Sequence, residues 1–463
     1  MEDCLRIIFT ELEEDSASLY SCILVNRFWC RIAIPILWKN PFIYFVYGKI
    51  SRDKLCNVII HLLPQSSKQL LFDNNIDLPP SSTFSNEPLF NYISFFSHIS
   101  PYYINDMIQT LTNKEEEKYL LKQEIYKLFI NNCNNIKEFS LNTDQPLFQY
   151  PGASTFFSQL CYLEIDLQSV TSTVLFGMGQ VCQNIEGLII TFRNGNISGL
   201  INLIDVQKNL RILYLDLRYR NLTNQCNGLS EVIERKATTL KYLKMKQCFA
   251  PFSPKFLPSL INLQYLEIKD GYEINESTEW QEWKKYLSIA SFPNLQYLRT
   301  ASFPCYEDYM LIEKSHGNLL EINIDRAYGY QDFTYNKKLI KAVAKNCPRI
   351  KRLMIDVDPK NLDGIKEIFL NCRQLEKIRF SSNNKVLICD ELLEIIVKFS
   401  PAETFCEFFS INWNFSVNGL QSFFENWRGR IPLKFNYYYC EKDFWTEQHL
   451  MIVEKYRKEG VIN

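Results

Sequence analysis

Hydrophobic positions recur along most of this chain with one short spacing. From Cys133 onward, an apolar residue is followed three positions later by a second and two positions after that by a third. The spacing is met at Ile136/Phe139/Leu141, Leu160/Leu163/Ile165, Ile185/Leu188/Ile190, Leu210/Leu213/Leu215, Leu240/Leu243/Met245, Leu263/Leu266/Ile268, Leu319/Ile322/Ile324, Ile350/Leu353/Ile355 and Leu375/Ile378/Phe380. Leu295/Leu298/Thr300 begins in the same way, and Cys406/Phe409/Ile411 is a weaker late copy. An Asn often precedes the first position, and the pattern predicts internal repeats.

The spacing has a structural interpretation. A step of three and then a step of two is typical of a turn that leads into a short strand, whose alternate side chains face inward. Helical patterns lie between these strands, for example at Leu200 to Asp205 and at Leu339 to Ala344. One strand and one helix in each repeat of roughly 25 residues is the leucine-rich-repeat arrangement. We therefore predict an α/β solenoid over residues 133–440, with a parallel sheet inside and helices outside.

The regions before and after the repeats are expected to cap them. Residues 41–132 read as a helical spacer and N-terminal cap, with a long helix from about Asn113 to Asn131. Residues 441–463 are expected to form a closing helix that seals the last repeat. The apolar residues of that helix are Phe444, Leu450, Val453 and Tyr456.

The first forty residues are dense in apolar positions at helical spacing. Leu5, Ile8, Phe9 and Leu12 follow the order i, i+3, i+4 and i+7, which places them on one helical stripe. A second helical pattern comprises Leu19, Cys22, Ile23, Val25 and Trp29. Three short helices cannot bury so much apolar surface among themselves. Part of this surface is therefore expected to serve a partner or the rest of the chain.

The order of these residues carries a family resemblance. Ile8-Phe9, Leu12, Leu19, Leu24-Val25, Trp29, Ile32-Ala33 and Leu37-Trp38 together resemble an F-box. F-boxes fold as a small helical module that docks on the adaptor subunit of a cullin-type ubiquitin ligase. The resemblance implies a three-helix module over residues 1–40. The adaptor contacts that it implies are Leu5, Ile8, Phe9, Leu12, Leu24, Val25 and Trp29. Family members usually have a Leu-Pro pair before the first helix, whereas Met1-Glu2-Asp3-Cys4-Leu5 lacks it.

An F-box-like start followed by repeats is similar to the fungal type of F-box/leucine-rich-repeat protein. This resemblance implies a non-catalytic, substrate-recognition subunit of an adaptor–cullin–F-box ubiquitin ligase. Its expected partners are the adaptor, a cullin held through the adaptor, and an unknown protein target. A second hypothesis is a repeat-based interaction scaffold with a degenerate F-box and no ligase role. A third is an enzyme whose site is assembled from distant residues.

The open side of the predicted sheet is where a target is expected to bind. Residues between the inward positions point to that side, and Tyr and Arg dominate binding hot spots. The candidate target-binding residues are Tyr214, Asp216, Arg218, Tyr219, Lys244, Lys246, Lys269 and Arg299. The other interpretation is that these polar side chains simply face water.

Composition narrows the partners and the compartment. The chain has 51 Lys and Arg against 52 Asp and Glu, so no net charge favours nucleic acid or an anionic membrane. No apolar run approaches the roughly 20 residues that span a bilayer. The start of the chain lacks a signal-peptide pattern. The 15 cysteines are therefore interpreted as reduced thiols of a cytoplasmic or nuclear protein.

Motifs for chemistry are weak. Cys133, Cys182, Cys347 and Cys372 each stand three residues before a first repeat position, which predicts core packing. There is no Cys-x-x-Cys pair, and the four histidines are scattered, so no metal site is expected. The segment from Gly177 to Gln180 is part of a dinucleotide fingerprint, but its flanks read as a repeat helix. No catalytic residue or cofactor is predicted.

Overall fold

The computed structural model of the chain describes residues 2–41, 49–79, 88–99, 101–192, 197–217, 227–246, 253–269, 278–301, 308–325, 333–382, 388–438 and 445–463. The chain divides into two compact units, Met1–Leu210 and Arg211–Asn463. The boundary falls within the region that the repeat pattern predicts as one solenoid.

Unit 1 starts with helices and continues into the first repeats. Its helices are α1 (Glu2–Glu11), α2 (Ser16–Val25), α3 (Arg27–Leu37), α5 (Lys49–His61), α6 (Gln65–Asp73), η2 (Tyr92–Phe95), α7 (Pro101–Leu111), α8 (Glu115–Asn132), η3 (Leu147–Gln149), α9 (Ala153–Ser158), α10 (Ser172–Val181) and α11 (Ser198–Asp205). Its strands are β1 (His98–Ile99), β2 (Glu138–Leu141), β3 (Tyr162–Asp166) and β4 (Gly187–Phe192).

Unit 2 alternates strands with helices to its end. Its strands are β5 (Ile212–Leu217), β6 (Tyr242–Lys246), β7 (Tyr265–Lys269), β8 (Tyr297–Ala301), β9 (Glu321–Asp325), β10 (Arg352–Asp356), β11 (Lys377–Ser381), β12 (Glu407–Ile411) and β13 (Lys434–Tyr438). Its helices are α12 (Asn227–Lys236), η4 (Pro254–Ser259), α13 (Thr278–Ile289), α14 (Asp308–Glu313), α15 (Phe333–Asn346), η5 (Pro359–Asn361), α16 (Leu362–Asn371), α17 (Asp390–Phe399), α18 (Val417–Trp427) and α19 (Glu447–Lys458).

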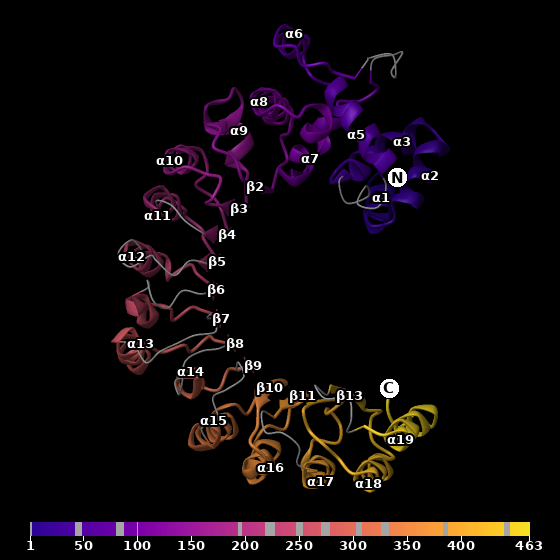
Figure 1. Cartoon of the computed structure of the whole chain (residues 1–463), viewed down its shortest axis with the longest axis vertical. Helices are drawn as coiled ribbons and strands as arrows, with labels where there is room; N and C mark the ends of the chain where they lie inside the picture. The colour runs from indigo at the N-terminus through magenta and orange to yellow at the C-terminus, as the bar shows by residue number, and fades with distance from the viewer. Residues whose placement is uncertain are drawn as a thin grey trace. The chain divides into compact units, whose positions relative to one another are not determined.

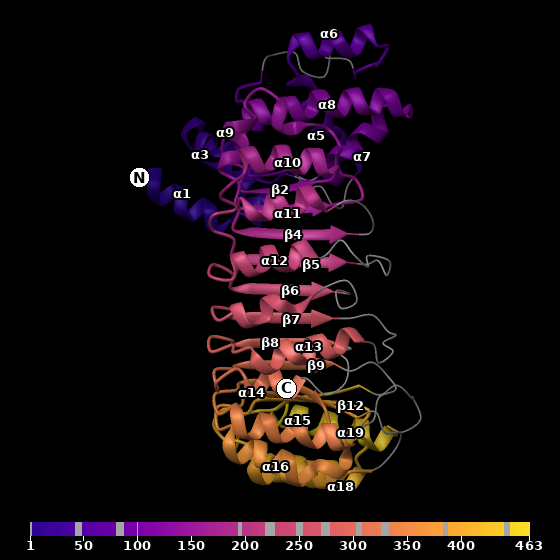
Figure 2. The ribbon, with the colours of Figure 1, turned by 90° about the vertical axis from the view of Figure 1, so that its left-hand side faces the viewer.

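Within each unit, neighbouring strands pair in parallel and in chain order. In unit 2, one apolar side chain of every strand aligns in a single buried row. That row is Leu213, Leu243, Leu266, Leu298, Ile322, Leu353, Ile378, Phe408 and Phe435. The repeat helices cover one face of the sheet and leave the other face open (Figures 1 and 2). The predicted leucine-rich-repeat α/β fold is thereby confirmed.

The Asn that precedes many repeats has a structural role. The side-chain amide of Asn262 donates to Thr238 O, and that of Asn294 donates to Ile261 O, both at 3.0 Å. Asn318 does the same to Pro293 O at 2.7 Å. Each bond reaches back to a turn carbonyl of the preceding repeat. The Asn therefore joins consecutive turns in a ladder of side-chain hydrogen bonds.

The late repeat predicted at Cys406/Phe409/Ile411 is wrong by one residue. In β12 the buried positions are Phe408 and Ser410, and Phe405 fills the first position of the repeat. Phe408 pairs with Phe435 of β13, so the register follows the neighbouring strand. Because the side-chain period of a strand is two, a slip of one residue exchanges the two faces. The polar Ser410 at an inward position concealed the correct register.

The predicted spacer contains part of the sheet. Strand β1 pairs in parallel with β2, so the repeats begin before residue 133. A strand of two residues is too short to show periodicity in the sequence. Helix α8 matches the long helix expected there and buries its apolar stripe. The residues of that stripe are Leu121, Ile125, Leu128 and Phe129.

The last repeat is closed by α19, which packs on α18. Val453 and Tyr456 are buried as predicted, but Leu450 is exposed. His449 takes the buried place instead, because its Nε2 donates to Phe415 O at 3.0 Å and its Nδ1 accepts from the Thr446 N–H. Phe444 lies outside the described residues. The chain end adds a parallel bridge to Leu433, which covers the edge beside β13.

Thr300 tests the inward position that lies two residues after the aligned row, which is at Leu298 in its own strand. It occupies the third inward position of its repeat, is 2% exposed, and its hydroxyl has no hydrogen-bond partner among the described residues. Thr300→Val should stabilise unit 2 by about 1 kcal/mol, because it removes an unpaired buried hydroxyl while keeping the shape. Ile268, paired with Thr300 in β7, provides the converse variant. Ile268→Thr should lower the urea midpoint, and equal midpoints for all three proteins would contradict the assignment.

The closing helix has a separate test. Removing residues 446–463 should expose the aromatic side chains of Phe424 and Phe435, lower the melting temperature and cause precipitation. Leu450→Ala, at an exposed position of α19, should leave solubility and melting unchanged. A truncated chain that stays soluble and melts like the full chain would show that α19 is not a cap.

Candidate binding surfaces

The first candidate surface lies on the three N-terminal helices. Six of the 22 strongly exposed large apolar side chains among the described residues lie between Ile7 and Phe28. We call them the N-terminal apolar set: Ile7, Ile8, Tyr20, Leu24, Val25 and Phe28. Concentrated exposure of this kind is typical of an interaction site.

The N-terminal helices are held by caps and a small core. The Asp15 carboxylate accepts from the Ser18 N–H at the start of α2, and Asn26 Oδ1 accepts from the Trp29 N–H at 2.9 Å at the start of α3. The ring of Phe9 lies edge-on to Trp29, with centroids 5.2 Å apart. The core of this module consists of Phe9, Leu19, Ile32 and Ala33. These helices therefore have an interior of their own that does not depend on the exposed set.

The seven predicted adaptor contacts separate into two groups. Ile8, Leu24 and Val25 are 54%, 70% and 56% exposed and belong to the N-terminal apolar set. The remaining four pack in the module core, where Phe9 is fully buried and the others are partly buried. These four are Leu5, Phe9, Leu12 and Trp29. The first group is exposed to solvent, whereas the second group contributes to the core of the module.

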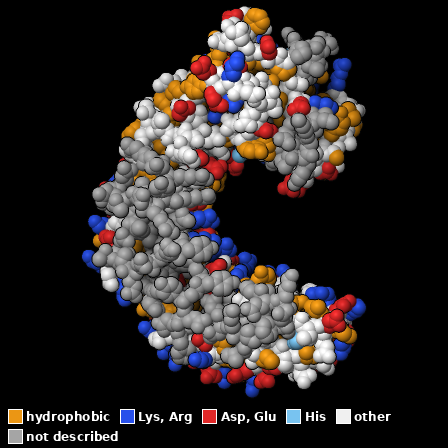
Figure 3. Space-filling model, in the orientation of Figure 1, with side chains coloured by type: hydrophobic (Ala, Val, Ile, Leu, Met, Phe, Trp, Pro, Cys, Tyr) orange, Lys and Arg blue, Asp and Glu red, His pale blue; other side chains and the backbone are white. Residues whose placement is uncertain are grey.

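The second candidate surface is the open face of the unit 2 sheet, where strand register aligns side chains in rows. The first row is Tyr242, Tyr265, Tyr297, Glu321, Arg352 and Lys377. The second row is Tyr214, Lys244, Glu267, Arg299, Asn323, Met354 and Arg379. The third row is Asp216, Lys246, Lys269, Ala301 and Asp325. Lys and Arg side chains line this side of the unit (Figure 3).

A buried carboxylate organises the middle of this face. Glu267 is 1% exposed, although its position in the strand points it to the open side. Tyr265 Oη donates to it at 2.6 Å, and Lys244 and Lys269 lie 3.2 Å and 3.1 Å away. Neighbouring side chains therefore cover a position that alternation in the strand turns to the open face.

The second buried carboxylate is Glu321. Arg299 approaches it at 2.7 Å from β8 and Arg352 at 3.1 Å from β10. The ion pair with Glu321 raises the pKa of Arg299. Two cations therefore converge on one carboxylate here, as they do at Glu267.

The environment keeps Glu267 ionised. Burial alone would raise the pKa of this carboxyl group, but hydrogen bonds from Tyr265 and Lys269 outweigh burial and lower it. Burial, together with the bond to Glu267, raises the pKa of the Tyr265 hydroxyl, so Tyr265 remains a donor. The carboxylate and its partners form one fixed unit at neutral pH.

The predicted target-binding residues are only partly brought together. Tyr214, Lys244, Lys246, Lys269 and Arg299 all lie on the open face. Asp216 lies there too, but it is 3% exposed and accepts from the Tyr214 hydroxyl at 3.2 Å. Arg218 and Tyr219 lie outside the described residues.

Sequence reasoning missed the first row. The Tyr242 and Tyr265 rings stack with centroids 3.9 Å apart, and Tyr297 follows at 6.2 Å from Tyr265. A signal was present, because a Tyr directly precedes the first inward strand residue in several repeats, including Tyr162 in unit 1. These tyrosines stand before the first inward residue of each strand, so the positions between inward residues do not include them.

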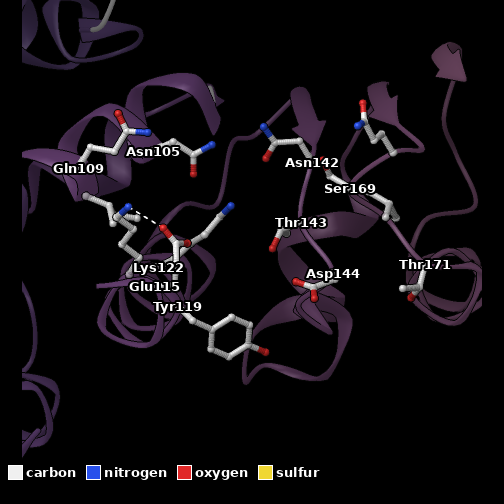
Figure 4. A pocket seen from close by; sticks show the side chains of 14 residues that line it. Asn105, Gln109, Glu115, Tyr119, Lys122, Asn142, Thr143, Asp144, Ser169 and Thr171 are labelled. Atoms are coloured by element: carbon white, nitrogen blue, oxygen red, sulfur yellow. Dashed lines mark hydrogen bonds and ion pairs between the residues drawn. The ribbon is translucent and has the colours of Figure 1, made fainter. Parts of the chain in front are cut away.

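A polar pocket of about 780 Å³ lies in unit 1. Asn142 and Asp144 follow β2 on one side, and Lys122 of α8 faces them on the other (Figure 4). Burial lowers the pKa of Lys122, while Asp144 opposes the shift. The pocket is lined by amide side chains and by side chains of both charges. These residues come from separate segments of the chain, so no sequence motif predicts the pocket.

The structure also describes the cysteines, the glycine segment and the metal-binding residue types that the sequence analysis considered. Cys133, Cys182, Cys347 and Cys372 are fully buried, and burial raises the pKa of each thiol, to about 12 at Cys372. Gly177 lies inside α10, where the Phe148 ring leaves no room for a side chain. Within the described ranges, no three His, Cys, Asp or Glu residues are placed to hold a metal ion. None of the helices described there is long and apolar enough to cross a membrane.

Comparisons with known proteins identify no family. No family profile matches the chain, and no curated protein matches it. Among solved structures, the crystal structure of a TLR13–ssRNA13 complex matches at 14% identity with a TM-score of 0.36, covering 68% of this chain and 41% of that one. The chain thus spans less than half of the TLR13 length. A Bacteroides fragilis protein matches at 14% identity with a TM-score of 0.30, covering 69% and 79%. With TM-scores below 0.5, neither match adds to the fold described above.

Glu267→Gln tests the buried carboxylate. A lowered folded pKa means that the ionised group stabilises the fold above its unfolded pKa near 4.5, and that this contribution is lost as pH falls through the folded value. The variant should therefore be less stable than the wild type by about 1 to 3 kcal/mol at pH 7, and this difference should shrink at lower pH. Urea unfolding at several pH values measures this. Glu394→Gln, an exposed site on α17, is the matched control. A deficit that does not change with pH would refute the ion-pair account.

Proposed function

We propose that this chain is the target-recruiting subunit of an adaptor–cullin–F-box ubiquitin ligase. Helices α1 to α3 would bind the adaptor, and the open face of the repeats would hold a protein target. The observation that carries the proposal is the N-terminal apolar set, which stands on helices whose residue order resembles an F-box. Leucine-rich repeats suit the second role, because their stacked strands present an extended binding surface.

The division within the N-terminal module supports adaptor docking. Phe9 and Trp29 maintain the fold of the module, so Ile8, Leu24 and Val25 are not needed for its core. Exposed Leu and Val side chains are costly in water and gain free energy when a partner covers them. The proposed contact is therefore apolar packing of helix on helix, the mode in which a groove receives a helical face.

The contacts between the module and the helices that follow it in unit 1 also support the proposal. The Trp38 ring, at the end of α3, lies 4.4 Å from the Tyr92 ring of η2 by centroid. The Ser97 N–H donates to Lys39 O at 2.9 Å, and Lys39 pairs with Glu13 at 2.8 Å. A ligase subunit must hold its target in a fixed position relative to the adaptor. These contacts would fix the adaptor relative to the first repeats.

The proposed role is not catalytic. The thiols of Cys133, Cys182, Cys347 and Cys372 are buried with raised pKa values, which makes these four poor nucleophiles. The ubiquitin transfer would be carried out by the other subunits and their enzymes. The chain would contribute affinity and position only.

Charge placed in the N-terminal apolar set tests the adaptor contact. Ile8→Lys combined with Leu24→Lys should weaken binding of the purified ligase adaptor by roughly 100-fold or more, since two buried apolar side chains together contribute about 3 to 6 kcal/mol. Phe72→Lys is the control, because Phe72 is 69% exposed on α6 of the same unit. Biolayer interferometry gives the affinities, and circular dichroism checks that each variant is folded.

Two results would count against the ligase role. The first is that the wild-type chain binds no adaptor. The second is equal weakening by the paired variant and by Phe72→Lys, which would show nonspecific adhesion. Either result would favour the alternative function, a repeat scaffold that holds other proteins without a ligase.

A further inference from the structure

We infer that the open face over β6 to β10 binds an acidic, extended segment of a protein target, through carboxylate or phosphate groups. We name the cations of this surface the basic face: Lys244, Lys246, Lys269, Arg299 and Arg352. The inference deepens the proposed function, because it rests on the repeats holding a target and specifies the chemistry of that target.

Burial separates the two signs of charge on this face. The side chains of Glu267 and Glu321 are 1% and 5% exposed, whereas those of the basic face are 23% to 50% exposed. A ligand that approaches the sheet therefore meets ammonium and guanidinium groups, with the carboxylates beneath them. The solvent-exposed positive charge of this face is therefore greater than its net charge, counted over all acidic and basic residues, would suggest. An anionic ligand is its electrostatic complement.

The buried carboxylates also fix the cations in place. Lys244 and Lys269 share Glu267, and Arg299 and Arg352 share Glu321. Lys246 lies 4.0 Å from Asp216 and 5.2 Å from the centre of the Tyr214 ring. Long flexible side chains normally lose conformational entropy on binding an anion, and side chains that are already held lose less. The side chains of the basic face are therefore preorganised for binding an anion.

The spacing of the cations specifies a cluster of acids. Neighbouring strands lie about 4.8 Å apart, and an extended peptide rises about 3.3 Å per residue. Acids that stand one to three residues apart would reach cations on neighbouring or alternate strands. Ala301, at the position between Lys269 and Asp325, has the smallest side chain of the third row. A single acidic residue would meet only one of these positions.

A protein segment fits better than a nucleic acid. The whole chain carries a net charge of −1, and Asp325 is exposed at one side of the basic face. A continuous phosphate backbone would meet this acid, whereas a short acidic segment can avoid it. Tyr242 and Tyr265 of the first row stack on each other, which occupies one face of each ring that a base would need.

The test measures binding of short fluorescent peptides to the full chain by anisotropy. One peptide carries clustered glutamates, a second carries phosphoserines at the same positions, and a third carries glutamines. The first two peptides should bind, and their binding should weaken with added salt. The third peptide should not bind. Comparison of the first two shows whether carboxylate suffices or phosphate is needed. A single-stranded oligonucleotide of similar length is the fourth probe.

Lys246→Gln combined with Lys269→Gln should weaken binding of the acidic peptides about tenfold. The matched control is Lys337→Gln with Lys341→Gln, which makes the same change of charge on the exposed side of α15. Equal loss in both variants, binding of the glutamine peptide, or tighter binding of the oligonucleotide would overturn the inference. Absence of peptide binding by the folded chain would overturn it too. Adaptor binding is measured in a separate experiment. Failure of the peptide-binding inference can therefore be distinguished from failure of the proposed ligase role.

Discussion

The structure depends on one constraint, the burial of an aligned row of apolar side chains between sheet and helices. A single strand and helix cannot cover its own apolar face, so each repeat is stable only against its neighbours. In unit 2 that row runs in register from Leu213 to Phe435, one residue from each strand. Once the row is fixed, the strand period of two fixes which residues lie on the opposite face.

The charged network of the open face follows from this constraint. Glu267 cannot turn away from its position without moving Leu266 and Ile268 out of the core. Because Tyr265 and the neighbouring lysines then cover it, the carboxylate must be paired or it would be destabilising. The same reasoning applies to Glu321 and its two arginines. The apolar row therefore sets the strand positions, and the ion pairs set where the cations stand.

The sequence predicted the fold where the signal was local and repeated. The three-and-two spacing placed most strands correctly, because each inward residue is buried by its own repeat as well as by its neighbours. It failed where a buried position is polar, as at Ser410, or where a strand is very short, as at β1.

The candidate surfaces were less accessible to sequence reasoning. Alternation placed Lys244 and Arg299 on the open face, but the burial of Glu267 depends on side chains from three different strands. In the N-terminal helices, the spacing put Phe9 and Ile8 on one stripe, whereas packing against α3 buries Phe9 and leaves Ile8 in water. A helical stripe identifies apolar residues, and only tertiary packing determines which of them face a partner.

The two surfaces differ in the forces that they offer a partner. The N-terminal apolar set offers contact area, which gains free energy by removal from water and depends little on ionic strength. The basic face offers fixed charges that are partly in solvent, whose attraction is screened within about 8 Å at physiological salt. In the proposed role, the chain would keep a persistent contact with its ligase and exchange its targets, and it would use this difference. The apolar contact would be retained as conditions vary, while the charged contact would respond to any change in the negative charge of the target.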